Sequence, residues 1–436
     1  LGHPGTLPKS NEKAIEYAVR LGLAVKSDIR HDMYYARKNY FYPDLPKGYQ
    51  ITQDKTPICT EGFIDLKQKE GPAKRIGITR IHMEEDAGKL IHSEDSNDSL
   101  VDLNRAGVPL LEIVSEPDVR SAEEAKIYME KIHAIATTIG ISDGDMEKGH
   151  LRCDANVSLR PSGQKEFGTR TETKNLNSFR FVKQAITYEM HRQREEILDG
   201  KTIIQETRLW DPDRKVTFSM RSKEEADEYR YFPDPDLPLV HLSTKILETF
   251  RKNLPELPET KKQRFMEEHG LSVYDAEVLS VSKEISAYFG KILSDGASPK
   301  ISCNWVIGEL TRVMNESGKS LHEIKITPEN LADLTKLIES GEISNKIAKT
   351  IFEEMLNSAK TPAHIIEEKG LKQISDAGKL GEIAEELLAA NQEQVDQYRA
   401  GKTKLIGFFV GQVMKQTRGK GNPAVINRLL KEKLDG

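Results

Sequence analysis

The strongest constraint on the fold is a change in sequence pattern that occurs once, across residues 232–260. Before it, short alternating segments typical of strands are separated by a few helical segments. After it, apolar residues recur at helical spacing. Five prolines interrupt the chain at the change: Pro233, Pro235, Pro238, Pro255 and Pro258.

No strand–helix–strand alternation is sustained in the first part, which disfavours a doubly wound parallel sheet. We therefore predict an α+β fold. A mainly antiparallel-sheet catalytic domain with a cradle form is followed by an all-α helical domain and a small helical tail domain.

The chain length requires more than one domain. Its 436 residues exceed the size at which a single hydrophobic core keeps growing. We place the boundaries in the proline-rich stretch and in the segment NSAKTPA, which spans residues 357–363. The predicted domains are residues 1–253, 254–360 and 361–436.

Charge is distributed unevenly along the chain. The whole protein has a net charge of −5, yet residues 402–436 carry eight basic and two acidic residues. The tail is therefore +6 and the remainder −11. Such a tail is typical of a module that contacts a polyanion, and its basic side chains suit phosphate contacts.

Localisation signals are absent from the sequence as given. No apolar run approaches the ~18 residues of a membrane span, and no signal-peptide pattern is present. The three cysteines, Cys59, Cys153 and Cys303, are too widely spaced to indicate a disulfide framework or a zinc site. We expect a cytoplasmic protein with no membrane partner.

Several elements of the first part can be predicted individually. Residues 63–68 and 75–81 form a β-hairpin, and residues 108–117 form a strand. A helix follows that begins with a capping box from Ser121 to Glu124 and ends at Gly140. Residues 150–161 and 168–175 are two further strands, followed by a helix over 178–199.

The run IGITRIHMEEDAGK at 76–89 places three acids, Glu84, Glu85 and Asp86, directly after a strand. A solvated turn and a site for a multivalent cation both explain it. Glu112 lies in a strand that is apolar on both faces, which predicts burial. A buried carboxylate must be protonated, paired with an arginine or bound to a metal.

Alternation along residues 151–160 places Arg152 and Asp154 on one polar face of a strand. Glu172 and Lys174 share a polar face in the next strand. A face that merely meets water would look the same. If the acids do bind a metal, oxygen ligands without a cysteine cluster favour Mg²⁺, and Mg²⁺ points to phosphoryl chemistry.

Other common catalytic and nucleotide-binding motifs are missing. SGKS at 317–320 and AGKT at 400–403 lack the first glycine of a Walker A loop, and no strand-linked G-x-G-x-x-G occurs. No Ser/His/Asp or Cys/His pairing is convincing, and His82 is equally compatible with a structural or a catalytic role. A nucleotide site would therefore be an open sheet with a metal held by carboxylates.

Long motifs then match one family in order. They are LGHPGTLPKSN at 1–11, RKNYFYPDLPKGYQIT at 37–52, RIGITRIHMEEDAGK at 75–89, VDLNRAGVPLLEIVSEPD at 101–118, LRCDANVSLRP at 151–161, TETKNLNSF at 171–179, YRYFPDPDLP at 229–238 and ITPENLADLTKLIESGEISNKIAK at 326–349. Over essentially its full length the chain resembles the GatB family, the B subunits of the aspartyl/glutamyl-tRNA(Asn/Gln) amidotransferases.

The resemblance implies an ATP- and Mg²⁺-dependent ligase that forms a heterotrimer with an amidase subunit and a small third subunit. The side-chain carboxylate of Glu-tRNA(Gln) or Asp-tRNA(Asn) would be phosphorylated and then amidated with ammonia from the amidase. It also implies a preceding strand with a GLEVH-like motif, which the sequence as given does not contain. A non-catalytic tRNA-binding scaffold and a free-standing carboxylate–amine ligase are the alternatives.

The resemblance also implies roles for individual residues. The metal ligands would be Glu85, Glu112 and Asp154. From the residues themselves we infer phosphate or carboxylate contacts for Arg152 and Lys174, with Glu172 as their orienting partner. His82 and Glu84 complete the predicted catalytic residues. Lys38 and Lys47 would line the ammonia route, with surface lysines as the alternative. In the tail, which resembles YqeY proteins, the tRNA-binding residues would be Lys402, Lys404, Lys415, Arg418 and Lys420.

Overall fold

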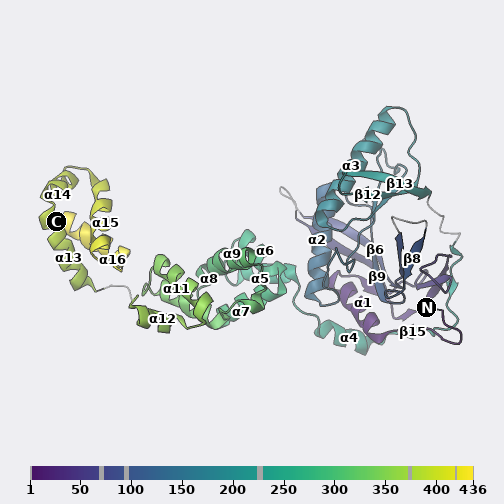
Figure 1. The fold of residues 1–436 in the computed structure, drawn as a ribbon, viewed down its shortest axis with the longest axis horizontal. Coiled ribbons are helices and arrows are strands. Elements are labelled where there is room, and N and C mark those ends of the chain that lie inside the picture. Colours follow the sequence, from purple (N-terminus) through teal and green to yellow (C-terminus); the bar gives the residue numbers. More distant parts are fainter. Residues whose placement is uncertain are drawn as a thin grey trace. The chain divides into compact units, whose positions relative to one another are not determined.

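The computed structural model describes residues 2–67, 73–92, 98–222, 229–371, 376–417 and 420–435. The chain divides into two compact units, Leu1–Pro258 and Glu259–Gly436. A mixed sheet-and-helix region is thus followed by a helical region, which confirms the α+β class (Figure 1). No helix in the described ranges is both long and apolar enough to cross a membrane.

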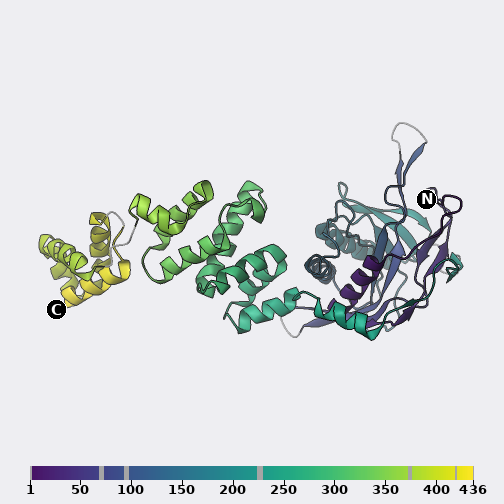
Figure 2. The same ribbon diagram turned by 90° about the horizontal axis from the view of Figure 1, so that it is seen from below.

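The first unit contains an antiparallel sheet in the order β1-β5-β6-β9. Its strands are β1 (Asp28–Ile29), β5 (Cys59–Leu66), β6 (Lys74–Glu85) and β9 (Pro109–Ser115). The pairing of β5 with β6 confirms the predicted hairpin as far as Leu66, and residue 68 of the prediction lies outside the described residues. The helix α1 (Glu12–Ala24) packs on β5 and β6, as Figure 2 shows, and α2 (Ala122–Thr138) packs on β5.

The first unit also contains smaller sheets and a helix that packs against α1. Three strands pair in the order β14 (Phe232–Pro233), β3 (Ala36–Asn39) and β4 (Tyr49–Thr52). Two-stranded pairs are formed by β2 (Asp32–Met33) with β15 (Val240–His241), and by β7 (Lys89–His92) with β8 (Ser99–Asp102). The helix α4 (Thr244–Lys252) packs against α1.

A second four-stranded sheet has the order β10-β11-β12-β13. Its strands are β10 (Ala155–Val157), β11 (Thr171–Lys174), β12 (Glu206–Asp211) and β13 (Val216–Ser222). β10 and β11 are shorter than the segments predicted from the sequence. β11 pairs with β12 in parallel, so this sheet is mixed. The helix α3 (Phe179–Leu198), capped by Ser178, packs on β10 and β13.

A fully buried carboxylate, Glu189 of α3, ties that helix to the sheet. Its oxygens accept hydrogen bonds from Thr171 of β11, Thr217 of β13 and Arg192, and Arg208 of β12 pairs with it at 3.1 Å. Burial raises the pKa of Glu189, but the hydrogen bonds from Arg192 and Thr217 outweigh it, so the pKa is lowered. The strand that carries Glu172 and Lys174 is therefore fixed from behind.

One predicted cap differs in its second half. The Ser121 side chain accepts a hydrogen bond from the backbone N–H of Glu124, as expected for a helix start. The Glu124 carboxylate instead accepts from the backbone N–H of Arg120 at 2.7 Å and from Lys74 Nζ at 2.6 Å. The capping box is therefore half formed, because the lysine of β6 draws the carboxylate outward.

The strand β6 changes its buried face part-way along. Ile76 and Ile78 are buried in the core of the first sheet, and so are Ile81 and Met83. The pairing with β9 shifts register between Ile78 and Arg80, a β-bulge. After the bulge the core-facing positions are odd-numbered, so Arg80 and the next even-numbered residues share the opposite face.

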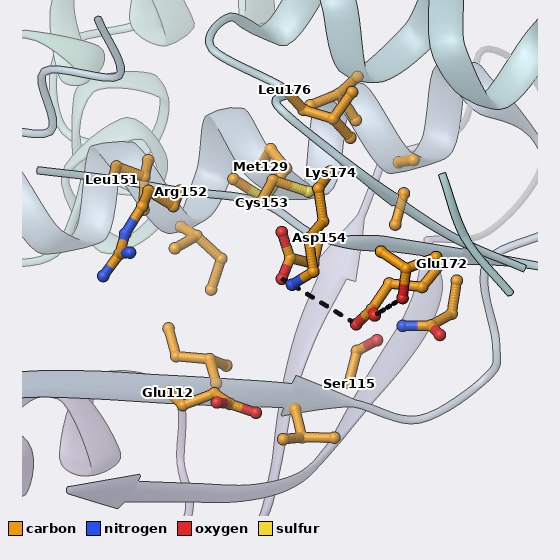
Figure 3. A pocket seen from close by; sticks show the side chains of 18 of the residues that line it. Glu112, Ser115, Met129, Leu151, Arg152, Cys153, Asp154, Glu172, Lys174 and Leu176 are labelled. Atoms are coloured by element: carbon orange, nitrogen blue, oxygen red, sulfur yellow. Dashed lines mark hydrogen bonds and ion pairs between the residues drawn. The ribbon is translucent and has the colours of Figure 1, made fainter. Parts of the chain in front are cut away.

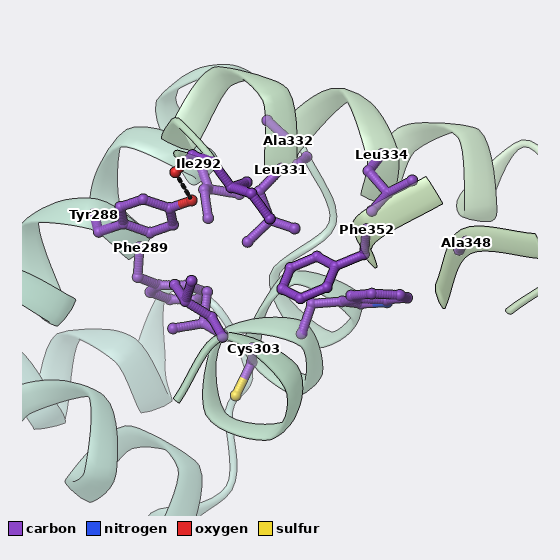
Figure 4. Close-up of a cluster of buried hydrophobic side chains, with 14 of the residues drawn as sticks. Tyr288, Phe289, Ile292, Cys303, Leu331, Ala332, Leu334, Ala348 and Phe352 are labelled. Atoms are coloured by element: carbon purple, nitrogen blue, oxygen red, sulfur yellow. Dashed lines mark hydrogen bonds between the residues drawn. The ribbon is translucent and has the colours of Figure 1, made fainter. Parts of the chain in front are cut away.

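The second unit is helical. Its core surrounds Tyr288, Phe289, Cys303 and Phe352, and the Tyr288 hydroxyl donates to the carbonyl of Ile326 at 2.9 Å (Figure 4). The α-helices are α5 (Pro258–Glu267), α6 (Val273–Val281), α7 (Lys283–Ser294), α8 (Pro299–Asn304), α9 (Thr311–Ser317), α10 (Pro328–Glu339), α11 (Asn345–Ser358), α12 (Pro362–Lys369), α13 (Ala377–Ala390), α14 (Gln392–Arg399), α15 (Ile406–Gln416) and α16 (Pro423–Asp435).

Residues 376–435 have a separate core. It contains buried residues of α13, α15 and α16, among them Leu380, Phe409 and Leu430. Phe409 is fully buried, whereas Phe408 is 39% exposed.

Candidate active site

A cavity of about 2990 Å³ lies in the first unit. Its lining comes from β6 and β9 of the first sheet, β10 and β11 of the second, and the helices α2 and α3. Most of the charged residues singled out from the sequence line it: Lys38, Glu84, Glu112, Arg152, Asp154, Glu172 and Lys174.

Three potential ligands converge at one wall of this cavity, where Glu84 and Glu112 line it and His82 is buried behind them. His82 and Glu84 project from the same face of β6, and Glu112 is the direct partner of His82 on β9. His82 Nε2 lies 3.3 Å from Glu84 Oε1 and 3.9 Å from Glu112 Oε2. One ligand atom from each of these three side chains lies within 4.8 Å of the other two, and the described residues contain this one cluster of the kind.

Glu84 is nearly buried and heavily hydrogen-bonded. Its carboxylate accepts from Thr52 Oγ1 at 2.7 Å and from Gln50 Nε2 at 3.2 Å. Burial raises the pKa of Glu84, but the contacts with His82 and Thr52 and the charge of Lys38 outweigh it and lower the pKa. Glu84 is therefore an ionised carboxylate at neutral pH.

The predicted burial of Glu112 is wrong. Its side chain is 51% exposed, because β9 is the edge strand of its sheet and this face of β9 borders the cavity instead of a second layer. Apolar residues on both faces of β9 are only partly covered for the same reason. Glu112 thus needs no internal partner and is open to a ligand from the cavity.

Glu85 lies on the other face of β6. Its Oε1 accepts from Lys47 Nζ and, at 3.0 Å, from the backbone N–H of Ile51. Both charged residues line a second cavity of about 620 Å³. The three predicted metal ligands Glu85, Glu112 and Asp154 are therefore not gathered in one cluster among the described residues.

Across the large cavity, the second sheet presents its own charged group. Lys174 Nζ lies 2.5 Å from Asp154 Oδ2 and 3.9 Å from Glu172 Oε1, and Thr207 donates to Glu172 at 3.1 Å. Figure 3 shows these side chains pointing toward one another, with Glu112 on the strand that faces them.

Arg152 is held apart from that group. Its Nη2 donates to Oδ2 of Asp86 at 2.8 Å, and Arg105 Nε approaches the same oxygen at 3.3 Å. Asp86, the last acid of the HMEED run, therefore joins two arginines at the cavity edge. The three consecutive acids therefore have different surroundings. Glu84 lines the large cavity, Glu85 binds Lys47 at the small cavity, and Asp86 forms ion pairs with the two arginines.

The two lysines predicted for the ammonia route lie in different cavities. Lys38 lines the large one, with its Nζ 4.7 Å from the Tyr229 ring centroid and 5.7 Å from that of Tyr40. Lys47 lines the small one beside Glu85. Glu84 lines both cavities.

Four residues that line the large cavity were not singled out from the sequence: Tyr40, Arg80, Tyr229 and Tyr231. The Tyr229 ring makes edge-to-face contacts with Tyr40 at 6.1 Å and with Tyr231 at 6.0 Å, and Arg80 precedes His82 on the same face of β6. The spacing of buried isoleucines in RIGITRI could have revealed Arg80. Its core positions change from even to odd at Thr79, which is the signature of a bulge.

The predicted tRNA-binding residues lie in the tail. Lys402, Lys404 and Lys415 are exposed and Lys420 is half-buried, and these four flank or belong to α15. Arg418 lies outside the described residues.

Comparison with known proteins agrees with this arrangement. Residues 1–248 match a family model described as the GatB/GatE catalytic domain, and residues 287–434 match one described as the GatB domain. The fold and site therefore define a catalytic component of the tRNA amidotransferase class. The non-catalytic scaffold alternative is not favoured, because the catalytic-domain match spans the whole cavity.

Relatives narrow the class to one family. Proteins named as the B subunit of aspartyl/glutamyl-tRNA(Asn/Gln) amidotransferase from Geotalea daltonii and Geobacter sulfurreducens are 58% and 56% identical to the chain over 439 residues. One of the same name from Carboxydothermus hydrogenoformans is 52% identical over 437 residues. Each alignment covers 100% of this chain and 91% of the relative. The chain belongs to the GatB family, the B subunits of the aspartyl/glutamyl-tRNA(Asn/Gln) amidotransferases.

Proposed function

We propose that the protein activates the side-chain carboxylate of Glu-tRNA(Gln) or Asp-tRNA(Asn) by ATP-dependent phosphorylation and directs its amidation. It works in a heterotrimer with an amidase subunit, which releases ammonia from glutamine, and a small third subunit. One observation carries the proposal: Glu84 and Glu112, which form a ligand cluster with the buried His82, face a lysine–carboxylate group across a single cavity.

The cluster suits a divalent cation. Ligand atoms on opposite sides of one Mg²⁺ are about 4.0–4.2 Å apart, twice the bond length of about 2.0–2.1 Å. The distances of 3.3 and 3.9 Å from His82 Nε2 to the two carboxylates fall within that reach. Two carboxylates and one imidazole leave room for water and phosphate oxygens, as Mg²⁺ requires. When bound, Mg²⁺ would screen the repulsion between the substrate carboxylate and the phosphates of ATP.

The chain's own residues would position both substrates. Lys174 and Arg152 are cations that can bind phosphate or carboxylate oxygens once these replace Asp154 and Asp86 as their partners. Glu172 accepts a hydrogen bond from Thr207 and lies two residues before Lys174 on β11. From there it orients the lysine.

The reaction then proceeds by two displacements. A carboxylate oxygen attacks the γ-phosphorus and ADP leaves, which gives an acyl phosphate. The nitrogen of ammonia attacks the acyl carbon, inorganic phosphate leaves, and the nitrogen loses a proton to give the amide. We place the ammonia route along Lys47 and Lys38, whose two cavities both reach Glu84.

The domains divide the work in this proposal. Residues 1–253 form the catalytic cradle, residues 254–360 a helical spacer and residues 361–436 a basic tail that contacts tRNA phosphates. The exposed lysines Lys402, Lys404 and Lys415 support the last assignment.

The test is amidation of Glu-tRNA(Gln) by the assembled complex with ATP and titrated Mg²⁺. Substitution of Glu84 by Gln should abolish both ADP formation and amidation while leaving tRNA binding intact. Glutaminase activity of the amidase serves as an internal control. Retention of full amidation by this variant would refute the catalytic assignment.

A further inference from the structure

Arg80 is a cation that faces the large cavity without a partner. It is half-buried on β6, and its Nε is inaccessible to solvent and has no hydrogen-bond partner. Among the residues that the structure describes, none forms a hydrogen bond or ion pair with its guanidinium. Partial removal of a charge from water without a compensating bond is costly, so such residues are normally paired.

Two other cations of the same cavity are paired with a carboxylate. Lys174 is bound to Asp154 and Arg152 to Asp86. Arg80 differs although acids are close by: Glu84 and Glu112 lie on the same faces of β6 and β9, and both are directed toward His82 instead. The sheet thus leaves the guanidinium available to an anion that enters the cavity.

The position of Arg80 is set by the bulge at Thr79. It pairs with Thr60 of β5 and with Val114 of β9, two positions before the pair formed by His82 and Glu112. Side chains two residues apart on a strand are about 7 Å apart, so Arg80 adjoins the proposed metal cluster. Its charge also acts on the hydroxyl of Tyr231, which lines the same wall.

We propose that Arg80 binds an oxyanion of the reaction beside the metal cluster. Two groups have this chemistry: the side-chain carboxylate of the aminoacyl residue and the terminal phosphate of ATP. The planar guanidinium can bind either with two parallel hydrogen bonds. The inference rests on the proposed function. It assigns a substrate contact to Arg80, which the motif RIGITRIHMEEDAGK alone does not mark as more than a structural arginine.

Kinetics of Arg80→Gln and Arg80→Lys in the assembled complex test the contact. Loss of the oxyanion contact should lower kcat/KM about 100-fold for the substrate that Arg80 binds. Arg80→Lys should restore only part of it, since one ammonium cannot replace a bidentate contact. Separate titrations of ATP and Glu-tRNA(Gln) identify the source: a raised KM for one and not the other assigns the oxyanion.

Arg75→Gln is the matched control. Arg75 lies on the same strand, but it is exposed, pairs with Asp65 and does not line the cavity. It should leave both KM values unchanged and report any general effect of removing an arginine from β6. If Arg80→Gln keeps both kcat/KM values within twofold of the unmodified protein, the inference is overturned.

A binding readout separates this inference from the proposed function. Phenylglyoxal labelling of Arg80, measured by mass spectrometry, should slow when Mg-ATP or Glu-tRNA(Gln) occupies the cavity, while labelling of Arg75 continues. Protection in a complex that shows no amidation would support the contact and refute the proposed reaction. Equal labelling of Arg80 with and without both substrates would refute the contact even if amidation proceeds.

Discussion

Replacing Glu112 by Gln should weaken Mg²⁺ binding strongly and lower the stability of the fold hardly at all. The side chain is 51% exposed, and its nearest ionic neighbour, His82 Nε2, lies 3.9 Å away. Exposed ion pairs contribute about 0.2–1 kcal/mol, so the free energy of unfolding should fall by less than about 1 kcal/mol. Loss of one of three protein ligands should raise the Mg²⁺ concentration for half-maximal activity at least 100-fold, because even outer-shell changes cost about 10–100-fold.

The assay is amidation of Glu-tRNA(Gln) at saturating ATP over a Mg²⁺ titration, together with thermal denaturation of the same variant. Glu130→Gln is the control, since Glu130 is 41% exposed on α2 and pairs with Lys126 outside the cavity. An unchanged Mg²⁺ half-saturation for Glu112→Gln would refute the cluster as a metal site. A large loss of stability would refute the edge-strand argument.

Three further predictions follow from burial and charge. Because the folded-state pKa of Glu189 lies below its ordinary 4.5, its contribution to stability is present above pH 4.5 and is lost as the pH falls through the lower, folded-state pKa. Glu189→Gln should therefore flatten the curve of stability against pH in that acid range. An unchanged acid part of the curve in thermal denaturation would contradict this. Phe352→Ala should cost about 3–5 kcal/mol in urea denaturation, since Phe352 is 1% exposed, against less than about 1 kcal/mol for the exposed Phe408; equal losses would refute it. Charge reversal at three exposed tail lysines should weaken tRNA binding and reduce its salt dependence, by about 0.7–0.9 in log–log slope per lost phosphate contact; an unchanged slope would exclude contacts from Lys402, Lys404 and Lys415.

The strand β6 shows which features could be predicted from the sequence and which could not. The alternation of residues 75–81 predicted a strand, and its pairing with residues 63–68 was correct as far as Leu66. The division of the three following acids could not be predicted, because a bulge at Thr79 changes which face each residue occupies. Motif matching therefore assigned Glu85 to the metal, whereas the geometry gathers Glu84 with His82 and Glu112.

Glu112 shows the same limit for burial. Its strand is apolar on both faces, and a central strand with that composition would be covered on both sides. Whether a strand is central or at an edge depends on pairings with residues far away in the sequence. Local pattern carries no information about that, so the expected burial was wrong.

The sequence by itself determined the α+β class, the helix start at Ser121, and the family, because each depends on local patterns or on motifs read in order. Only the tertiary structure decided which charged residues meet. Contacts between residues such as His82 and Glu112 depend on register, bulges and strand order. Those are set by burial of the whole core, since a one-residue shift would turn every side chain of the strand to the opposite face.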